Sequence, residues 1–314
     1  MTLNILHLRY ALEVEKTGSI TSAADHLFVG QPNLSKAIKE LESFIGITIF
    51  KRTSKGMIPT QKGAEFLNNA RKVISKIDEL DNMYSMGKVK KRFFNVSVPR
   101  ASYVSLAFTR FLEGLDEGER LEVNFKETNS LEAVRNILEN EYNLGIIRYH
   151  ADYEKYFLNL LEAKNIHAHT LWEFDCVVVM SKHHPLAKKK KLTWEDLRGY
   201  TMLVHGDTAI PSVTHSEMQV PEMVENIDRK IYLYERGSQM DLLRSVSGTY
   251  MLVSPIPEEL LKANGLILRK CSGLKGRYKD VIIYPKNYKL KRLDKEFIES
   301  LYSVKDALEK NTYS

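Results

Sequence analysis

Cysteine is scarce in this chain of 314 residues, which contains only Cys176 and Cys271. The two are far apart in sequence, and Cys176 lies inside an apolar stretch, which is more typical of reduced structural thiols than of a disulfide or a redox switch. The chain also has no long apolar run, no signal peptide and no lipidation motif. These absences predict a soluble, cytoplasmic protein without a membrane partner.

Motifs of catalysis and of metal binding are missing as well. The sequence has no nucleophile elbow, P-loop or GxGxxG pattern, and Gly237-Ser238-Gln239 lacks the flanking residues of a catalytic serine. Its nine histidines do not gather at metal-ligand spacing, and there is no CxxC or HExxH pattern. We therefore expect no enzyme activity, no metal site and no resident cofactor.

Residues 20–42, ITSAADHLFVGQPNLSKAIKELE, contain a helix-turn-helix pattern. Two short apolar faces at helical spacing meet at a break over residues 28–31, and they consist of Ala23, Ala24 and Leu27, then Leu34, Ala37, Ile38 and Leu41. The small alanines allow a second helix to cross closely over the first. Gly30 is an acceptable N-cap of the second helix, and Pro32 suits its first turn.

The outward face of the second helix carries side chains that suit DNA. Glutamine and asparagine can pair with adenine, while lysine and serine suit phosphates or guanine edges. We expect groove contacts at the start of this helix from Gln31, Pro32, Asn33, Ser35 and Lys36. Contacts to phosphates or the minor groove are expected from Thr21, Lys39, Arg52 and Lys55. The alternative is the ordinary solvated face of an amphipathic helix, and the flanking segments argue against it.

Those flanking segments complete a winged fold. Upstream, the apolar pattern from Leu3 to Val14 predicts a helix that stops near Gly18, with Thr21 as the N-cap of the next helix. Downstream, residues 47–50 predict a short strand, residues 52–56 a basic turn and residues 57–58 a return strand. Arg52 and Lys55 then lie near the tip of a two-stranded wing, where they suit phosphates or the minor groove.

The charge of the chain is concentrated in the same segment. Residues 1–92 contain 15 Lys and Arg against 9 Asp and Glu, a surplus of six that equals the net charge of the whole chain. Residues 93–314 therefore balance, with 31 residues of each sign. A polyanion-binding module joined to a neutral one explains this asymmetry, although the surplus is modest.

A third helical pattern runs from Thr60, its candidate N-cap, to about Ser85. Its apolar stripe consists of Phe66, Leu67, Ala70, Val73, Ile74, Ile77, Leu80 and Tyr84. A helix of about 25 residues spans about 37 Å, too long for a domain of about 60 residues to cover. We expect the stripe to pair with its copy in a homodimer, the alternative being packing against the chain's own C-terminal region. Met86–Arg92 then form a polar hinge.

Residues 93–314 alternate between predicted strands and helices, which indicates two doubly wound α/β subdomains with parallel sheets. Strands are predicted at 93–98, 121–126, 144–147, 171–180, 202–204, 230–234, 251–253 and 280–284. Helices are predicted at about 103–115, at about 131–140 and from about residue 293. Sheets of this type bind ligands at the C-terminal ends of their strands.

A series of short motifs keeps its order and spacing without gaps in residues 5–63. The motifs are Leu8-Arg9-Tyr10, Thr17-Gly18-Ser19, Ala23-Ala24, Gln31-Pro32, Leu34-Ser35, Ile38, Leu41-Glu42, Gly46, Phe50, Arg52-Thr53 and Thr60-Gln61-Lys62-Gly63. This segment resembles the N-terminal domain of LysR-type transcriptional regulators, with Gly30 where that family more often has serine. Looser cues at 143–147, 184–187 and 246–255 resemble the family's effector-binding domain, which shares its fold with periplasmic solute-binding proteins.

The resemblance implies a small-molecule effector in the cleft between the two C-terminal subdomains. The strand-end positions that face this cleft are Arg100, Ala101, Ser102, Tyr103, Thr128, Asn129, Arg148, His205, Thr249 and Tyr250. Two arginines among them suggest an anionic effector held bidentately, and Tyr103 and Tyr250 offer flat walls. The alternative for Arg148 is an ion pair with a nearby glutamate at the subdomain edge.

The expected fold is an N-terminal all-α winged helix-turn-helix domain and long linker helix, followed by an α/β region like periplasmic binding proteins. Its domains are residues 1–59, which bind DNA, residues 60–92, the linker or dimerisation helix and hinge, and residues 93–314, which bind the effector. Within the last, subdomain I is 93–170 with 279–314, and subdomain II is 171–278.

The expected function is sequence-specific transcriptional regulation on double-stranded DNA under the control of that effector. The resemblance further implies homodimers that join into homotetramers, with RNA polymerase as another candidate partner. The alternative is a ligand-binding or metabolite-converting protein with a vestigial DNA-binding domain. Neither activity requires the helix-turn-helix and wing, whose presence therefore favours the regulator.

Overall fold

The structure is a computed structural model that describes residues 3–54, 56–84, 92–116, 118, 120–139, 142–207, 227–274 and 276–312. The chain divides into two compact units, Met1–Lys91 and Arg92–Ser314, and each is described here by itself. Among the described residues, no helix has the length and apolar character needed to cross a membrane.

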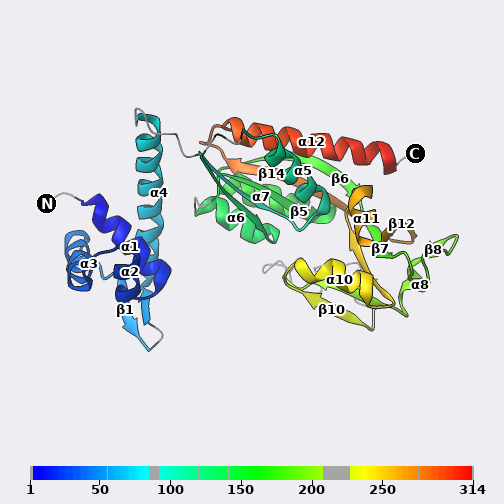
Figure 1. The fold of residues 1–314 in the computed structure, drawn as a ribbon, viewed down its shortest axis with the longest axis horizontal. Coiled ribbons are helices and arrows are strands. Elements are labelled where there is room, and N and C mark those ends of the chain that lie inside the picture. Colours follow the sequence, from blue (N-terminus) through cyan, green and yellow to red (C-terminus); the bar gives the residue numbers. More distant parts are fainter. Residues whose placement is uncertain are drawn as a thin grey trace. The chain divides into compact units, whose positions relative to one another are not determined.

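The first unit contains the expected helices and wing (Figure 1). Its elements are α1 Ile5–Thr17, α2 Ile20–His26, α3 Gln31–Ile45, β1 Phe50–Thr53, β2 Gly56–Pro59 and α4 Gln61–Tyr84. The apolar faces predicted for α1, α2 and α3 pack into one core, in which Leu8, Ala23 and Leu34 are completely or almost completely buried. Burial of these faces against one another is what holds three short helices together in water.

The ends of α1 and α2 show how the turns are made. α1 ends at Gly18 as predicted, with a φ of 64° that glycine adopts without strain. The prediction that Thr21 caps α2 is wrong, because helical backbone already begins at Ile20. Ser19 is the N-cap, and its Oγ accepts a hydrogen bond from the N–H of Ser22 at 3.3 Å. Thr21 is exposed in the first turn of α2.

The wing begins later than predicted. The carboxylate of Glu42 accepts hydrogen bonds from the N–H groups of Ile49 at 2.6 Å and Phe50 at 3.1 Å, so residues 47–49 lie outside the strand. β1 and β2 pair antiparallel, with Arg52 opposite Met57. Arg52 therefore lies in β1 and not in the turn. Lys55 and the hinge residues 86–91 lie outside the described residues.

α4 begins at the predicted cap, since Thr60 Oγ1 accepts the N–H of Gly63 at 2.9 Å. The apolar stripe of α4 divides into two parts. Leu67, Ala70 and Ile74 are buried in the core of the first unit, whereas Val73 and Leu80 are 44% and 51% exposed. The first unit thus covers more of the apolar stripe than we expected from the length of α4. The side chains of residues 78, 79 and 81–84, with Tyr84 among them, lie outside the description.

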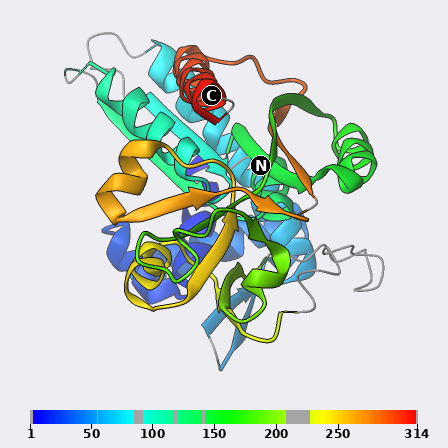
Figure 2. The same cartoon turned by 90° about the vertical axis from the view of Figure 1, so that its right-hand side faces the viewer.

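The second unit has two lobes, each built on one five-stranded sheet. Lobe I contains β3 Arg92–Val98, α5 Ser102–Glu113, β4 Leu121–Glu127, α6 Ser130–Leu138, β5 Leu144–His150, α7 Glu154–Ala163, β6 Ile166–Asp175, β14 Arg277–Pro285 and α12 Arg292–Thr312. Its strand order is β4-β3-β5-β14-β6. Helices α5 and α12 cover one face of this sheet and α6 and α7 the other, with a separate core on each side (Figures 1 and 2).

Lobe II is smaller. It contains β7 Val177–Ser181, β8 Leu192–Thr193, α8 Trp194–Leu197, β9 Thr201–His205, β10 Lys230–Leu233, α10 Gly237–Ser245, β11 Thr249–Val253, α11 Glu258–Asn264, β12 Leu266–Arg269 and β13 Cys271–Ser272. Its five-stranded sheet has the order β10-β9-β11-β7-β12. The two lobes are joined at residue 176 and between β13 and β14, so the chain leaves lobe I and returns to it.

The sheets are mixed rather than purely parallel. β3, β4 and β5 are parallel, but β14 runs antiparallel to both β5 and β6. In lobe II, β9, β10 and β11 are parallel, and β7 is antiparallel to β11 and β12. The prediction of parallel sheets missed the strands that follow each crossing between lobes, because the chain enters the new sheet from the opposite end.

Two strand predictions are corrected. The predicted strand 171–180 is two strands in different sheets, β6 and β7, and the predicted subdomain boundary after residue 170 falls inside β6. The apolar sequence continues through the crossing at Cys176, so its pattern contains no break. β5 extends to His150 because it pairs with β14 along its length, which places Arg148 within the strand and not beyond it. α7 was not predicted.

Candidate functional site

α3 presents the predicted DNA-facing residues on the side away from the core. Gln31, Pro32, Asn33, Lys36 and Lys39 are exposed, and Ser35 is half-buried. The opposite face of α3 is held by buried apolar side chains, so the helix cannot rotate this polar face inward. Lys36 forms a 3.8 Å ion pair with Glu40, both side chains being well exposed. Such a surface pair is weak and leaves the lysine available to a phosphate.

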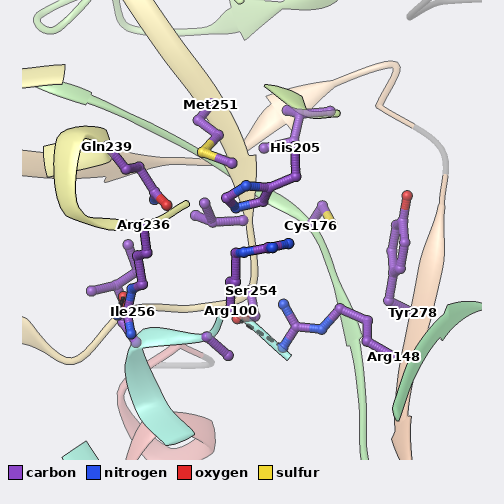
Figure 3. Close-up of a pocket in the computed structure, with 14 residues that line it drawn as sticks. Arg100, Arg148, Cys176, His205, Arg236, Gln239, Met251, Ser254, Ile256 and Tyr278 are labelled. Atoms are coloured by element: carbon purple, nitrogen blue, oxygen red, sulfur yellow. Dashed lines mark hydrogen bonds between the residues drawn. The ribbon is translucent and has the colours of Figure 1, made fainter. Parts of the chain in front are cut away.

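The second candidate site is a cavity of about 140 Å³ between the two lobes of the second unit (Figure 3). Its lining residues are Arg100, Ala101, Ser102, Arg148, Cys176, His205, Arg236, Gln239, Met251, Leu252, Val253, Ser254, Ile256 and Tyr278. This described lining contains three arginines and no carboxylate. The partners of the arginines therefore decide what the cavity can bind.

Arg100 extends from lobe I to lobe II. Its Nη1 and Nη2 donate to the two carboxylate oxygens of Asp207, each at 2.8 Å, and Nη2 also donates to the carbonyl of Tyr234 at 3.0 Å. Burial alone raises the pKa of Asp207, but hydrogen bonds and charge from Arg100, with a further hydrogen bond from Asn129, outweigh burial and lower it. Asp207 is therefore ionised and the bridge carries full charges.

Arg236 makes the opposite connection, from lobe II to lobe I. It precedes α10, and its Nη1 donates to Glu127 at 2.6 Å and to the hydroxyl of Ser105. Its Nη2 donates to the hydroxyl of Ser102 at 3.0 Å. Each lobe therefore supplies one arginine to the other, and each arginine meets a carboxylate there.

Arg148 is held within lobe I at the wall of the cavity. Its Nε and Nη2 each donate to Asp280 at 2.7 Å, and Nη2 also donates to Ser254 at 3.3 Å, the dashed bond in Figure 3. The Tyr103 hydroxyl donates to the same carboxylate, which is fully buried. Burial would lower the pKa of Arg148, but the ion pair with Asp280 raises it, so the guanidinium stays charged.

Two further titratable groups of the lining are neutral. Burial, with the charges of Arg100 and Arg236, lowers the pKa of His205 to about 4. Burial raises the pKa of Cys176 to about 12, so its thiol is protonated and weakly reactive at neutral pH. Among the described residues, no group of three or more His, Cys, Asp or Glu is placed to hold a metal ion.

Five of the ten residues predicted for the effector site line the cavity, namely Arg100, Ala101, Ser102, Arg148 and His205. The other five do not. Tyr103 and Tyr250 are fully buried and provide no walls, while Thr128 and Thr249 are buried at strand ends. Asn129 caps α6 by accepting the N–H of Glu132 at 2.9 Å, and it contacts Asp207 instead of the cavity. The alternative for Arg148 was right in kind, but its partner is Asp280 rather than a glutamate.

The most important residue that the sequence did not reveal is Arg236. It follows β10 by three positions, so the rule that ligands bind at strand ends could have found it. The same rule could have found Ser254, which directly follows β11. Tyr278 had no such signal, because it lies in a strand that was predicted to begin later. Cys176 was assigned to a strand interior and lies at the other crossing.

Comparison with protein-family models matches both units. A model described as the bacterial regulatory helix-turn-helix protein, lysR family, matches residues 5–64. A model described as the LysR substrate binding domain matches residues 115–304, more than half of the chain.

Curated relatives and solved structures agree with these matches. The chain is 26% identical over 219 residues to the HTH-type transcriptional regulator AlsR of Bacillus subtilis, covering 67% of each. It is 28% identical over 192 residues to the uncharacterized regulator YbhD of Escherichia coli, of which it covers 56%. A full-length OxyR variant of Pseudomonas aeruginosa has a TM-score of 0.62 at 16% identity, covering 96% of this chain and 95% of that one. CbnR complexed with its target DNA gives 0.61 at 16% identity, covering 96% and 100%.

Proposed function

Since the chain belongs to the LysR family of DNA-binding transcriptional regulators with an effector-binding domain, we propose that its effector is a small acid bound in the cavity between lobes I and II. The observation that carries this proposal is the convergence of Arg100, Arg148 and Arg236 on that cavity. A cavity of about 150 Å³ holds a molecule such as benzene, so an effector of similar size fits.

Thermal unfolding of the full chain with matched pairs of small molecules tests this proposal. Each pair consists of an acid and its neutral amide, for example benzoate with benzamide, so that size and shape are nearly the same while the negative charge is absent from the amide. Ligands that bind the folded state raise the midpoint of unfolding with their concentration. We expect the acids to raise it and the amides to have little effect. Stabilisation by neutral compounds alone contradicts an acidic effector.

For the DNA-binding unit, we propose groove contacts by Gln31, Asn33, Ser35 and Lys36 beside Pro32. Contacts to phosphates or the minor groove are proposed for Thr21, Lys39, Arg52 and Lys55. The exposure of the described members of this set on α2, α3 and β1, apart from the half-buried Ser35, supports the assignment. Footprinting of genomic fragments selected by the purified chain locates the operator, and the genes beside it narrow the choice of acid.

We propose that two copies pair through the exposed part of the α4 stripe. Val73 and Leu80 lie on this face and remain accessible within their own unit. Two winged units joined in this way read an inverted repeat, and further association into tetramers brings four such units onto one operator. We also propose that the regulator acts in the cytoplasm with RNA polymerase as a partner, and that it binds its effector without converting it.

A further inference from the structure

The proposed acidic effector raises a question of charge, because the cavity has no net charge to offer. Arg100, Arg148 and Arg236 each form an ion pair, with Asp207, Asp280 and Glu127 respectively. His205 is neutral at pH 7. An acid added to this balanced set brings one uncompensated negative charge into a buried site, which is strongly unfavourable. Binding therefore requires one internal carboxylate to leave.

Resting on the proposed function, we infer that the carboxylate of Asp207 occupies the place of the effector's acidic group, and that the effector binds by displacing it. The Asp207 carboxylate thus makes, within the protein, the contacts to Arg100 that the carboxylate of the effector would make. The exchange is one carboxylate for another on Arg100, so no charge is created in the buried site. The acid brings its own negative charge, and Asp207 carries its charge out into solvent.

The other two carboxylates are poorly placed to leave. Asp280 lies in β14 with none of its side chain exposed, and both Tyr103 and Arg148 donate to it. Glu127 belongs to β4, in register with Val98 of β3, and receives Arg236 from lobe II. Removing Asp280 from its partners leaves a buried charge uncompensated within a sheet. Glu127 is 22% exposed, but its backbone is fixed in the register of β4 with β3.

Asp207 differs from both in its position, since it lies in the turn after β9, outside regular structure. Its side chain is 27% exposed, against 22% for Glu127 and none for Asp280. A rotation of its side chain moves the carboxylate toward water without breaking the pairing of a strand. Asp207 is ionised while it is paired with Arg100, and it stays ionised in water. The exchange therefore needs no proton transfer.

The donors that Asp207 leaves behind form a ready carboxylate site. The guanidinium of Arg100 stays anchored by its hydrogen bond to the Tyr234 carbonyl, at 3.0 Å, and its two Nη donors keep their bidentate geometry. The side-chain amide of Asn129 loses the same partner and becomes available. Arg100 itself lines the cavity, next to His205 in Figure 3. A carboxylate on a body about the size of a benzene ring matches these donors and this space.

The exchange also changes how the lobes are tied. At the cavity, Arg100 with Asp207 and Arg236 with Glu127 bridge the lobes, and the incoming acid replaces the first while leaving the second. A more exposed pair, Arg110 with Glu259, also joins the lobes and is left intact. Binding of the acid therefore breaks one connection between lobe I and lobe II, the ion pair of Arg100 with Asp207. This gives the ligand a different affinity for the two states, as any effector of a conformational equilibrium must have.

Affinities for benzoate and benzamide in full-length variants test the exchange. Asp207→Asn removes the competing charge, and we expect benzoate to bind it at least about tenfold more tightly than the unmodified chain, because the competent fraction of Arg100 rises. Glu127→Gln removes an equal charge beside the same cavity but leaves Asp207 on Arg100, so it gives no such gain. Asp241→Asn, whose side chain is 72% exposed on α10, is the surface control.

The outcomes separate the two ideas. Equal tightening in Asp207→Asn and Glu127→Gln indicates a general effect of charge and overturns the exchange. No tightening in Asp207→Asn, while the unmodified chain prefers benzoate to benzamide, overturns the exchange but leaves the acidic effector standing. If benzamide binds every chain at least as tightly as benzoate does, the proposal of an acidic effector is itself contradicted.

A chemical rescue makes the test independent of benzoate. Asp207→Ala leaves Arg100 without its carboxylate, and we expect acetate to restore the lost thermal stability of this variant while acetamide does not. In the unmodified chain and in Asp241→Ala, Asp207 still competes for Arg100, and acetate lacks a body that fills the cavity, so we expect a much smaller response than in Asp207→Ala. Equal responses to acetate in all three chains overturn the inference.

Discussion

Phe28 illustrates how one backbone angle can conflict with its side chain. It follows the C-cap of α2 with a φ of 54°, and its side chain is 95% exposed. The N–H of Val29 bonds to the carbonyl of Ala24 at 3.0 Å and that of Phe28 to Asp25 at 3.2 Å, a Schellman motif. Glycine or asparagine usually occupies this left-handed position, since other residues are strained there.

Replacing Phe28 by asparagine should therefore stabilise the first unit. We expect the free energy of unfolding to rise by roughly 0.5–1 kcal/mol, because asparagine tolerates the left-handed conformation and no buried contact is lost. Urea unfolding monitored by circular dichroism measures the change. Phe44→Asn is the matched control, since Phe44 is 40% exposed but lies in helix α3, where asparagine is the poorer helix former. Destabilisation by Phe28→Asn would show that the ring has a structural contact.

Gln31 and Arg52 should affect DNA binding in different ways. Gln31 lies at the first position of α3, so Gln31→Ala should lose about 1–3 kcal/mol of discrimination against the wrong base. Arg52 lies exposed in the wing, and Arg52→Ala should weaken binding to all duplexes and reduce the salt slope by about one. Titration of operator and random duplexes at several salt concentrations checks both. Equal losses on both duplexes for Gln31→Ala contradict its assignment to the groove.

At the scale of elements, the apolar stripe of α4 has a buried part and an exposed part, and we propose that the exposed part pairs two copies. Ile74 is 8% exposed and belongs to the core of the first unit, whereas Leu80 is 51% exposed. Ile74→Asp should destabilise the unit by several kcal/mol, because an unpaired charge enters its core, as estimated for such changes at about 3–5 kcal/mol. Leu80→Asp should leave its folding intact but convert dimers to monomers. Light scattering with thermal unfolding measures both, and a Leu80→Asp chain that stays dimeric contradicts pairing through this face.

The elements that could be predicted are those with a local signal. α1, α2 and α3 followed from helical periodicity and from Gly18 and Gly30 at their ends, and α4 from the cap at Thr60, whereas the cap of α2 was wrongly assigned to Thr21. The late start of β1 could not be predicted, since it depends on Glu42, seven residues away from Ile49, capturing two backbone N–H groups. The crossing at Cys176 was equally hidden, because both sides of it are apolar and extended.

In the cavity, too, the features with a local sequence signal could be predicted and those that depend on distant residues could not. Arg100, Ser102 and His205 could be predicted because they lie where strands end, and strand ends are visible in sequence. Their ion pairs could not, since Asp207 lies 107 residues from Arg100 and Glu127 lies 109 residues from Arg236. The sequence therefore revealed Arg100 and Arg148 but not Arg236, and it did not show that Arg100 is already paired with a carboxylate. Because Arg100 is already paired with Asp207, we infer that an acid binds there only by exchanging its carboxylate for that of Asp207.

At the scale of the whole molecule, the first unit matches the DNA-binding domain of the family and the second its substrate-binding domain, so the response to the proposed acid should begin with a change within lobes I and II. The two bridges that reach the cavity, Arg100–Asp207 and Arg236–Glu127, are the pairs between lobes that a ligand there can alter. A ligand shifts such an equilibrium only through its different affinity for the two states. Breaking the Arg100–Asp207 bridge by mutation should therefore imitate the ligand.

Asp207→Asn should place the regulator in its effector-bound state without any acid. The asparagine keeps the size of the side chain but gives up most of its attraction for Arg100, as the acid does when it displaces Asp207. We expect the variant alone to give the DNase I footprint and DNA bend that the unmodified chain gives only with its effector, with little further change on adding acid. Asp241→Asn should keep the full response. A variant that binds acid tightly but still needs it to change the footprint would separate occupancy of Arg100 from the signal, and would place the switch at the Arg236–Glu127 bridge instead.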